Sequence, residues 1–498
     1  MKLNRKNLKS INQREGLSIP GEAIFSLPEK VLQFGTGALL RGLPDHFIDK
    51  ANRLGIFNGR IVVVKSTNAG NTDAFDQQQG LYSLCVKGIE KGISRDEVII
   101  NSSISRVLSA QENWSTIMEC AANPELKLII SNTTEVGITL VQDDIRWAPP
   151  VSFPGKLLAF LYERFRVFGG KAEAGMVIIP TELILDNGSK LRSILLELSK
   201  MNGLSREFHD WLADHNYFCN SLVDRIVPGA LPAAEQKTLE SLLGYEDELM
   251  IMAEPFRLWA IETDNEKVKQ LLSFSLADEG VVIAPDIEKF RELKLRLLNG
   301  THSFTCALAF LAGFKTVKET MNDPLISNYV HELMWKEIGP AMISDEISLQ
   351  EVETFAGAVI ERFRNPYLEH QWLAISMQYS SKMKMRNVPL IVAHYKRSDT
   401  VPQRMAKGFA AFLLFMKGSE QKSYSIKDDK AAWFAENWKE YGIENIAEKI
   451  LSDQNLWGAD LTAFPGFSEA VKHYLENMVK NGVMAMLEKD PTEKTMIA

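Results

Sequence analysis

Short apolar runs alternate with longer amphipathic segments through the first half of the chain. The runs are rich in valine and isoleucine, show no regular polar alternation and have the length of buried strands. They are KVLQF (30–34), RIVVV (60–64), LKLIIS (126–131) and GMVIIP (175–180). Between them, segments such as 153–165 place apolar residues at helical spacing. Strands that alternate with helices predict an α/β fold with a doubly wound parallel sheet.

The pattern changes near residue 286, after which strand-like runs become scarce and amphipathic stretches follow one another. These stretches cover 286–313, 324–338, 346–363, 402–417, 429–437 and 466–486. Their apolar positions recur with the period of a helix. We therefore predict two domains, a Rossmann-like dinucleotide-binding domain at residues 1–285 and a mainly α-helical substrate and catalytic domain at residues 286–498.

The composition narrows the class of protein. Of the 498 residues, 45% are hydrophobic and 24% are charged, which is typical of a globular protein. A formal net charge of −8 offers no basic surface, so we expect no nucleic-acid partner. The longest apolar run, residues 409–416, is far below the roughly 20 residues that cross a bilayer, so we expect no membrane span and a cytoplasmic location. The four cysteines lie far apart without a CxxC pair, which argues against a cysteine-bound zinc ion.

A glycine turn follows the first predicted strand, in VLQFGTGALLRG. Gly35 and Gly37 would let the backbone approach a pyrophosphate just before a helix begins. The third glycine of the usual GxGxxG pattern is missing, because Leu40 stands there and Gly42 comes two residues later. A tight turn without a ligand is the alternative. The residues expected to contact a dinucleotide are Phe34, Gly35, Thr36, Gly37 and Ala38.

Two further strand ends belong to the same expected cofactor site. The second strand ends in Lys65 and not in the acid that binds the ribose diol of NAD, so the choice between NAD and NADP stays open. The third strand runs into SNTTEVGI (131–138), where Asn132 and Thr133 would lie at the carboxyl edge of the sheet. A polar turn with a helix cap at Thr133 or Thr134 is the alternative.

Polar residues also follow the later strands of the first half. The segment after 175–180 presents Glu182, Asp186 and Asn187, and CNSLVDRIVPG places Asn220 and Asp224 among apolar residues. Asparagine and aspartate at such positions can bind substrate, but each of them alone is more often structural than catalytic.

The stretch KLRLLNGTH (294–302) sets three polar residues within a helical, leucine-rich segment. At about 100° per residue, His302 lies about 80° and Asn299 about 140° around an α-helix from Lys294, so one broad face could hold all three. Burial lowers the pKa of a lysine toward the range useful for proton transfer at neutral pH. An asparagine can hold a carbonyl oxygen without titrating. The alternative is an ordinary amphipathic helix whose lysine reaches solvent.

Taken in order, GTGALLRG, SNTTEVGI, DNG, VDRIVPG and KLRLLNGTHS resemble the mannitol dehydrogenase family, the polyol-specific long-chain dehydrogenases. The resemblance runs from about residue 28 to beyond residue 390, and KxxxxNxxH is the active-site signature of that family. The segments SNTTEVGI, LVDRIV and FRNPYLEHQWLAIS look most like the members that interconvert D-tagaturonate and D-altronate in hexuronate breakdown.

The resemblance implies a metal-independent oxidoreductase and a role for each residue that fits the motifs. Lys294 would protonate the ketone oxygen during reduction and act as the base in the reverse direction. Asn187 and Asn299 would polarise the carbonyl, and His302 would bind a neighbouring hydroxyl and keep Lys294 in place. Asp224 would be a further contact with the substrate.

The resemblance implies less about which residue binds the carboxylate of the substrate and about which cofactor is used. Lys382 matches a position that contacts substrate, whereas Ala374 stands where mannitol-oxidising members carry an arginine. A uronate needs a cationic partner for its carboxylate, and Lys382, Arg386 and Arg364 are the candidates. The resemblance favours NAD(H) as cofactor, and Lys65 keeps NADP(H) open.

The expected protein is a monomer or homodimer that acts on a small sugar acid. Fructuronate, which would give mannonate, is the nearest alternative substrate. An epimerase that holds NAD tightly and a sugar-acid sensor without turnover are alternatives from other classes, and the Lys294, Asn299 and His302 set speaks against the sensor.

Overall fold

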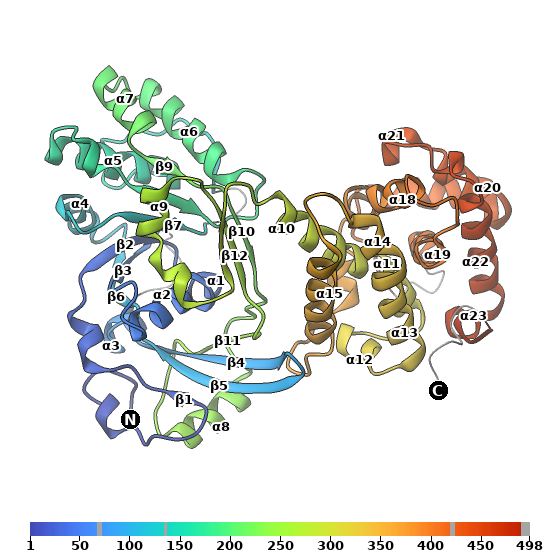
Figure 1. The fold of residues 1–498 in the computed structure, drawn as a ribbon, viewed down its shortest axis with the longest axis horizontal. Coiled ribbons are helices and arrows are strands. Elements are labelled where there is room, and N and C mark those ends of the chain that lie inside the picture. Colours follow the sequence, from blue (N-terminus) through green and yellow to red (C-terminus); the bar gives the residue numbers. More distant parts are fainter. Residues whose placement is uncertain (67–71, 134–136, 419–423, 490–498) are drawn as a thin grey trace. The chain divides into compact units, whose positions relative to one another are not determined.

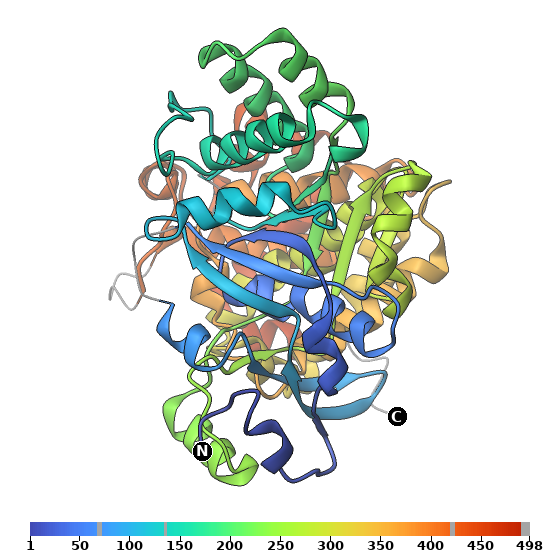
Figure 2. The same ribbon diagram turned by 90° about the vertical axis from the view of Figure 1, so that its left-hand side faces the viewer.

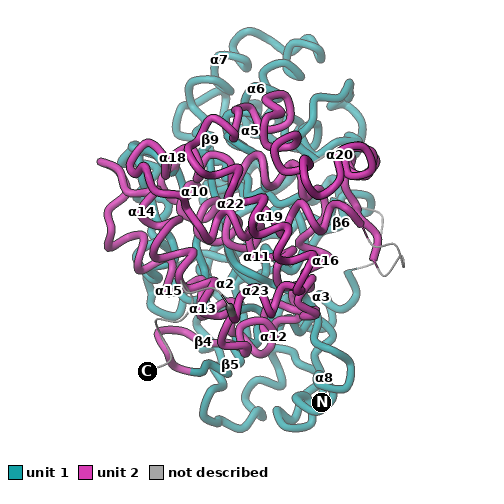
Figure 3. The backbone as a smooth tube through the Cα atoms, turned by 90° about the vertical axis from the view of Figure 1, so that its right-hand side faces the viewer, with its two compact units in different colours: residues 1–87, 94–287 teal, residues 88–93, 288–498 magenta. Residues whose placement is uncertain are grey.

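The computed structural model describes residues 1–66, 72–133, 137–418 and 424–489. The chain forms two compact units, which we describe separately (Figure 3). Unit 1 comprises residues 1–87 and 94–287, and unit 2 comprises residues 88–93 and 288–498. Within the described ranges, no helix is both long and apolar enough to cross a membrane.

Unit 1 is built on a six-stranded sheet with the order β6-β3-β2-β7-β8-β9, in which neighbouring strands run parallel (Figure 1). Its strands are β2 (Glu29–Phe34), β3 (Arg60–Lys65), β6 (Ile104–Ser109), β7 (Leu128–Ser131), β8 (Val177–Pro180) and β9 (Tyr217–Phe218). The chain moves outward from β2 through β3 to β6 and then returns to β7 on the other side of β2. The predicted doubly wound parallel sheet is therefore confirmed, and its topological switch point lies between β2 and β7.

Alternate residues of each central strand enter two different cores. Val31 of β2 packs in the core that includes Phe47 of α2, whereas Leu32 packs in the core that includes Leu157 of α5. Both faces of the sheet are thus covered, which explains why the strands read as unbroken apolar runs. The helices of this unit are α1 (Ala38–Gly42), α2 (Pro44–Arg53), α3 (Asp73–Gln77), α4 (Trp114–Glu119), α5 (Phe153–Phe168), α6 (Asn187–Met201), α7 (Arg206–Asp214), α8 (Ala233–Leu243) and α9 (Glu266–Leu271).

Two smaller sheets lie in unit 1, apart from the tip of the β4–β5 hairpin at residues 88–93, which belongs to unit 2, and the apolar pattern did not predict them (Figure 2). One has the order β1-β5-β4-β11 and the other the order β10-β12-β13. Their strands are β1 (Leu17–Ser18), β4 (Tyr82–Glu90), β5 (Ile93–Asn101), β10 (Ser221–Asp224), β11 (Ile251–Ala253), β12 (Leu258–Glu262) and β13 (Val281–Ala284). Lys91 and Gly92, with φ of 53° and 76°, make the tight turn from β4 to β5.

Unit 2 is helical, as predicted, and its helices share one apolar core. Its helices are α10 (Glu288–Leu293), α11 (Thr301–Leu311), α12 (Val317–Met321), α13 (Pro324–Glu332), α14 (Gly339–Met342), α15 (Leu349–Phe363), α16 (Trp372–Ile375), α17 (Tyr379–Lys382), α18 (Val388–Tyr395), α19 (Gln403–Lys417), α20 (Ala431–Leu451), α21 (Gln454–Trp457), α22 (Phe467–Asn481) and α23 (Val483–Lys489). Three segments, η6 (Lys294–Gly300), η7 (Leu333–Ile338) and η8 (Met383–Asn387), are π-helices.

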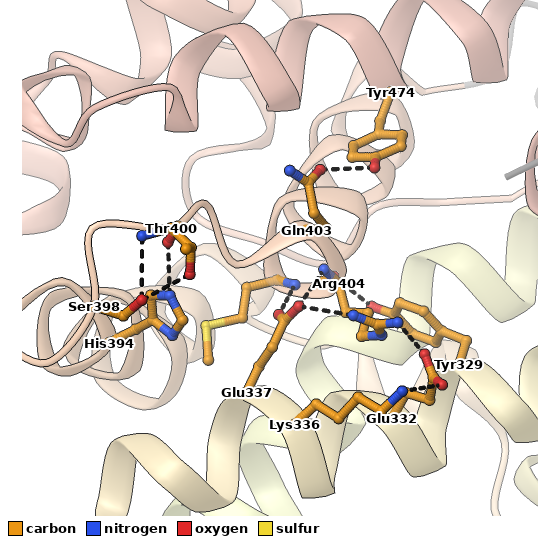
Figure 4. Close-up of polar contacts among 11 residues, drawn as sticks. Tyr329, Glu332, Lys336, Glu337, His394, Ser398, Thr400, Gln403, Arg404 and Tyr474 are labelled. Carbon is orange, nitrogen blue, oxygen red and sulfur yellow. Dashed lines mark hydrogen bonds and ion pairs between the residues drawn. The ribbon is translucent and has the colours of Figure 1, made fainter. Parts of the chain in front are cut away.

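Buried charges join η7 to the start of α19, the helix at the centre of unit 2 (Figure 4). The Glu337 carboxylate accepts the backbone N–H groups of Arg404 at 2.9 Å and Met405 at 2.8 Å. The Arg404 side chain pairs with Glu332, which also accepts from Lys336 at 2.6 Å. Because a helix start leaves backbone N–H groups without partners, a carboxylate there fixes α19 in place.

Candidate active site

The glycine turn after β2 lies at the switch point of the sheet. Gly35 has φ of +126°, and a Cβ there would come within 2.9 Å of the Asn132 carbonyl oxygen and 2.8 Å of Leu40 Cδ1. Only glycine fits this turn between neighbouring strand ends. Gly37 differs, because a Cβ there would have no atom within 4 Å, so the space beside the start of α1 is open. The turn can therefore receive a pyrophosphate against its backbone.

Hydrogen bonds between β2, β7 and β8 fix the ends of these strands. The Asn132 backbone N–H donates to the Phe34 carbonyl at 3.2 Å, and its side-chain amide donates to the Thr181 carbonyl at 2.9 Å. Thr133 donates to the Glu182 carboxylate through its N–H at 2.9 Å and its hydroxyl at 3.1 Å. Burial raises the pKa of Glu182, and these hydrogen bonds oppose the rise.

The Thr133 hydroxyl donates to Glu182, and the alternative interpretation of this loop as a helix cap stays a prediction, because the next residues, 134–136, lie outside the described ranges. Thr134, the other candidate cap, lies outside the described residues. Lys65 is the last residue of β3 and is buried at the carboxyl edge, one strand away from Phe34. Its place suits a residue near the adenosine ribose, and its role in cofactor choice stays a prediction.

Asn187, the first residue of α6, is saturated by the backbone of unit 1. Its amide nitrogen lies within hydrogen-bond distance of the carbonyl oxygens of Pro180 (3.0 Å), Glu182 (3.0 Å) and Ser221 (3.1 Å). Its oxygen accepts from Gly188 and Ser221, and the residue is 1% exposed. Both amide hydrogens are thus committed to backbone carbonyls, which makes Asn187 a residue that positions the end of β8.

Asp224 ends β10 and is buried. It lies in unit 1, as do the glycine turn and Asn187, whereas Lys294, Asn299, His302, Lys382 and Arg386 lie in unit 2. The predicted contact of Asp224 with a substrate held by unit 2 stays a prediction.

The stretch from Lys294 to Gly300 is a π-helix, so the α-helical angles expected for it were wrong. In a π-helix the backbone hydrogen bond joins residues five apart, which therefore lie on the same side of the helix. Lys294 and Asn299 are five apart, so they share a face more closely than an α-helix would allow. Single π-helical turns occur often at functional sites, where they aim side chains that regular winding would separate.

His302 is the second residue of α11, the helix that follows η6, and aromatic rings surround its side chain. Its ring stacks on Phe363 with centroids 4.3 Å apart and lies edge-on to His370 at 5.1 Å. Its buried Nε2 has no hydrogen-bond partner within the part of the chain that the structure describes. Burial lowers the pKa of His302 well below its ordinary value, and the charges of His370, Arg362, Arg386 and Lys382 lower it further. The imidazole is therefore neutral at neutral pH.

The second π-helix, η8, packs against η6. The Asn387 amide donates to the Gly300 carbonyl at 3.0 Å, and Arg386 Nη1 donates to the Ser303 hydroxyl at 3.3 Å. Lys382, just before η8, donates to the Ile375 carbonyl at 2.7 Å. Burial, and after it the charge of Arg386, lowers the pKa of Lys382. The structure thus brings Arg386 to Ser303, the residue after His302, and the positive charges of Arg386 and Lys382 contribute to the lowered pKa of His302.

Several residues around His302 were missed by the sequence analysis. The rings of Phe363 and His370 pack against the His302 ring, and the charge of Arg362 lowers its pKa. They lie 60 to 68 residues after His302 in the sequence, outside the motifs whose residues were given roles. The one available signal was the quoted segment FRNPYLEHQWLAIS, which contains Phe363 and His370 but was used only for the resemblance.

Comparisons with known proteins cover both units. A family model described as the mannitol dehydrogenase Rossmann domain matches residues 29–272, and one described as the mannitol dehydrogenase C-terminal domain matches residues 286–479. An altronate oxidoreductase of Bacillus subtilis (strain 168) is 36% identical over 467 residues, which cover 93% of this chain and 95% of the relative. One of Escherichia coli O1:K1 / APEC is 35% identical, with coverages of 96% and 98%.

Two solved structures share the fold. The mannitol 2-dehydrogenase of Pseudomonas fluorescens, solved as a ternary complex with NAD and D-mannitol, has a TM-score of 0.68 at 25% identity and covers 98% of this chain and 99% of its own. A D-sorbitol dehydrogenase in substrate-free form has a TM-score of 0.76 at 21% identity, covers 98% of this chain and 100% of its own, and shows the fold alone.

Proposed function

Because the chain belongs to the mannitol dehydrogenase family, a family of oxidoreductases, we propose that it interconverts D-tagaturonate and D-altronate with NAD(H) as cofactor. Two relatives that align with more than nine-tenths of this chain are named altronate oxidoreductase, and these names support the proposed substrate. The observation that supports the chemistry is the π-helical winding of the segment with Lys294 and Asn299, which leads directly into α11 and its neutral His302.

The end of β2 fits a dinucleotide. The open space beside Gly37 leaves room for a pyrophosphate, and Phe34, Thr36 and Ala38 lie on the same turn. Asn132 and Thr133 line the neighbouring strand end, and Lys65 lies where the adenosine ribose is expected. When bound, the reduced nicotinamide supplies the hydride that the ketone carbon accepts.

The residues of unit 2 supply the proton and hold the oxygen. The Lys294 ammonium donates its proton to the ketone oxygen as negative charge develops there, and the neutral amine takes a proton from the hydroxyl in the reverse reaction. The Asn299 amide donates a hydrogen bond to the same oxygen, which stabilises the developing alkoxide. Neither step requires a metal ion.

His302 and Lys382 bind the rest of the substrate. The unpartnered Nε2 of His302 can bond to a hydroxyl next to the carbonyl, and a neutral ring adds no positive charge that would repel the Lys294 ammonium. Lys382 and Asp224 are further substrate contacts. Asn187 has its amide committed to backbone carbonyls, so we assign it the positioning of the β8 end and not direct contact with the oxygen.

An assay of NADH and NADPH oxidation against D-tagaturonate, D-fructuronate, D-fructose and fructose 6-phosphate tests the proposal. We expect D-tagaturonate with NADH to give the highest kcat/KM. A preference for fructuronate would change the substrate and keep the chemistry, since the two keto acids differ in hydroxyl stereochemistry and not in charge. Turnover of a sugar acid without net oxidation of NADH would favour an epimerase, and no turnover of any compound would contradict the proposal.

A further inference from the structure

The guanidinium of Arg386 is a partly buried cation of unit 2. Arg386 lies in η8, and its side chain makes one hydrogen bond, to the Ser303 hydroxyl at 3.3 Å. Among the described residues, no carboxylate forms an ion pair with it. Burial lowers its pKa to about 10, and no acidic neighbour opposes that shift. Removing a charge from water without a counterion costs free energy, so an anionic ligand that binds beside this guanidinium would be stabilised.

The guanidinium lies beside the residues that we assign to the reaction. Ser303 follows His302 directly, and its hydroxyl donates to the Asn299 carbonyl at 3.0 Å while it accepts from Arg386. Arg386 thus contacts the residue that follows His302 in the chain, and its positive charge contributes to the lowered pKa of His302. A ligand that reaches His302 with one end can therefore reach Arg386 with an anionic group.

The other two candidate cations fit a carboxylate less well. Arg364 is exposed and donates to the Ser327 hydroxyl at 3.4 Å. The Lys382 ammonium already donates to the Ile375 carbonyl at 2.7 Å. A guanidinium also presents paired N–H groups in a planar fork that matches the two oxygens of a carboxylate, whereas an ammonium acts as a point charge.

We infer that Arg386 binds the carboxylate of the substrate and selects sugar acids over neutral ketoses. This inference rests on the proposed function, because it assigns the carboxylate of a keto sugar acid to one side chain. It also makes Ser303 a positioning residue that holds the guanidinium toward η6.

The test compares an acid with its neutral counterpart. Arg386→Gln and Arg386→Lys are assayed with NADH on D-tagaturonate and on D-tagatose, in which a hydroxymethyl group replaces the carboxylate. We expect Arg386→Gln to raise KM for tagaturonate about 10- to 100-fold, as for the loss of a charge-assisted pair, and to change kcat/KM for tagatose less than about threefold. Arg386→Lys keeps the positive charge but lacks the planar pair of N–H groups, so its KM for tagaturonate should lie between those of the wild type and Arg386→Gln. Lys384→Gln, an exposed neighbour on η8, serves as the control and should resemble the wild type.

The outcomes separate the two proposals. An equal loss on acid and ketose in Arg386→Gln would show that Arg386 only supports the fold, which overturns this inference and leaves the proposed function intact. Failure of the wild type to reduce tagaturonate would contradict the proposed function itself. If tagatose turnover is below detection, the Kd values of altronate and altritol for the NAD-bound enzyme replace the two rates. We then expect Arg386→Gln to raise the Kd of altronate and to leave the Kd of altritol unchanged.

Discussion

The guanidinium of Arg296 lies 3.0 Å from the backbone carbonyl oxygen of Arg386, and this hydrogen bond ties η6 to η8. The same nitrogen lies 2.6 Å from the Met385 carbonyl oxygen, and Nε pairs with Glu292 at 2.9 Å. Because π-helical winding shifts the backbone hydrogen bonds of η8, its carbonyl groups can accept from a side chain of the neighbouring helix. Arg296 thus holds the segment with Arg386 against the segment with Lys294.

We expect Arg296→Lys to lower kcat/KM for tagaturonate about tenfold, because an ammonium cannot reach both carbonyl groups and Glu292 at once. NADH affinity should stay at the wild-type value. Glu292→Gln is the matched control, since it weakens the ion pair and leaves both carbonyl contacts. Steady-state kinetics with both variants distinguish the two interactions, and an equal loss in Glu292→Gln would contradict the role given to the carbonyl contacts.

Lys294→Ala should remove the proton donor while the cofactor site stays intact. General acid catalysis contributes about 100- to 10,000-fold, so we expect kcat to fall by that factor. NADH binding, followed by fluorescence titration, should remain unchanged. Added methylammonium should restore part of the activity of Lys294→Ala, and Lys315→Ala, an exposed lysine of the same unit, should behave as wild type. Activity near the wild-type level in Lys294→Ala would contradict the mechanism.

The sheet of unit 1 could be predicted because its central strands are covered on both faces. Val31 and Leu32 enter different cores, so β2 shows an unbroken apolar run that stands out in the sequence. The strand β5, which pairs with β4, does not show such a run, because it carries charged residues such as Arg95 and Glu97 through its first half. Their pairing depends on the turn at Lys91 and Gly92, which the apolar pattern does not reveal.

The residues of the candidate site could be proposed from motifs, but their geometry could not. The winding at Lys294 is coupled to packing against η8, more than 80 residues away, and local spacing says nothing of that contact. The hydrogen bonds between Asn187 and Ser221 join residues 34 apart in the sequence, and no local motif reveals them. The sequence does not distinguish Arg386 from the other two candidate cations, because its side-chain hydrogen bond to Ser303 joins residues 83 apart.

The two glycines of the turn after β2 should respond differently to alanine. Gly35→Ala places a Cβ against the Asn132 carbonyl and Leu40 at positive φ, so we expect a loss of stability of about 1 to 3 kcal/mol. Gly37→Ala meets no atom and has φ of −62°, so its Tm should stay unchanged. The methyl group would still occupy the open space beside the turn, and KM for NADH should rise about tenfold or more. A normal KM for NADH in Gly37→Ala would argue against a pyrophosphate at this turn.

His302 should make the protein less stable as the pH falls below about 6.5. Burial, followed by the charges of His370, Arg362, Arg386 and Lys382, holds the pKa of His302 well below its unfolded value. Between the two pKa values the unfolded chain binds more protons than the native protein, so the free energy of unfolding rises with pH. The stability is present above pH 6.5 and is lost as the pH falls toward the native pKa, by at most about 1.4 kcal/mol per pH unit.

His302→Phe isolates this contribution, because a phenyl ring can stack on Phe363 and does not titrate. Thermal unfolding of both proteins at pH 7.5 and pH 5.5 should show a smaller fall in Tm for the variant. His370 also has a lowered pKa and titrates in both proteins, so the difference between the two slopes reports His302 alone. Equal slopes would mean that His302 takes up its proton in the native state as readily as in the unfolded chain. A charged imidazolium in the proposed site would then oppose the protonated lysine that the proposed reduction requires.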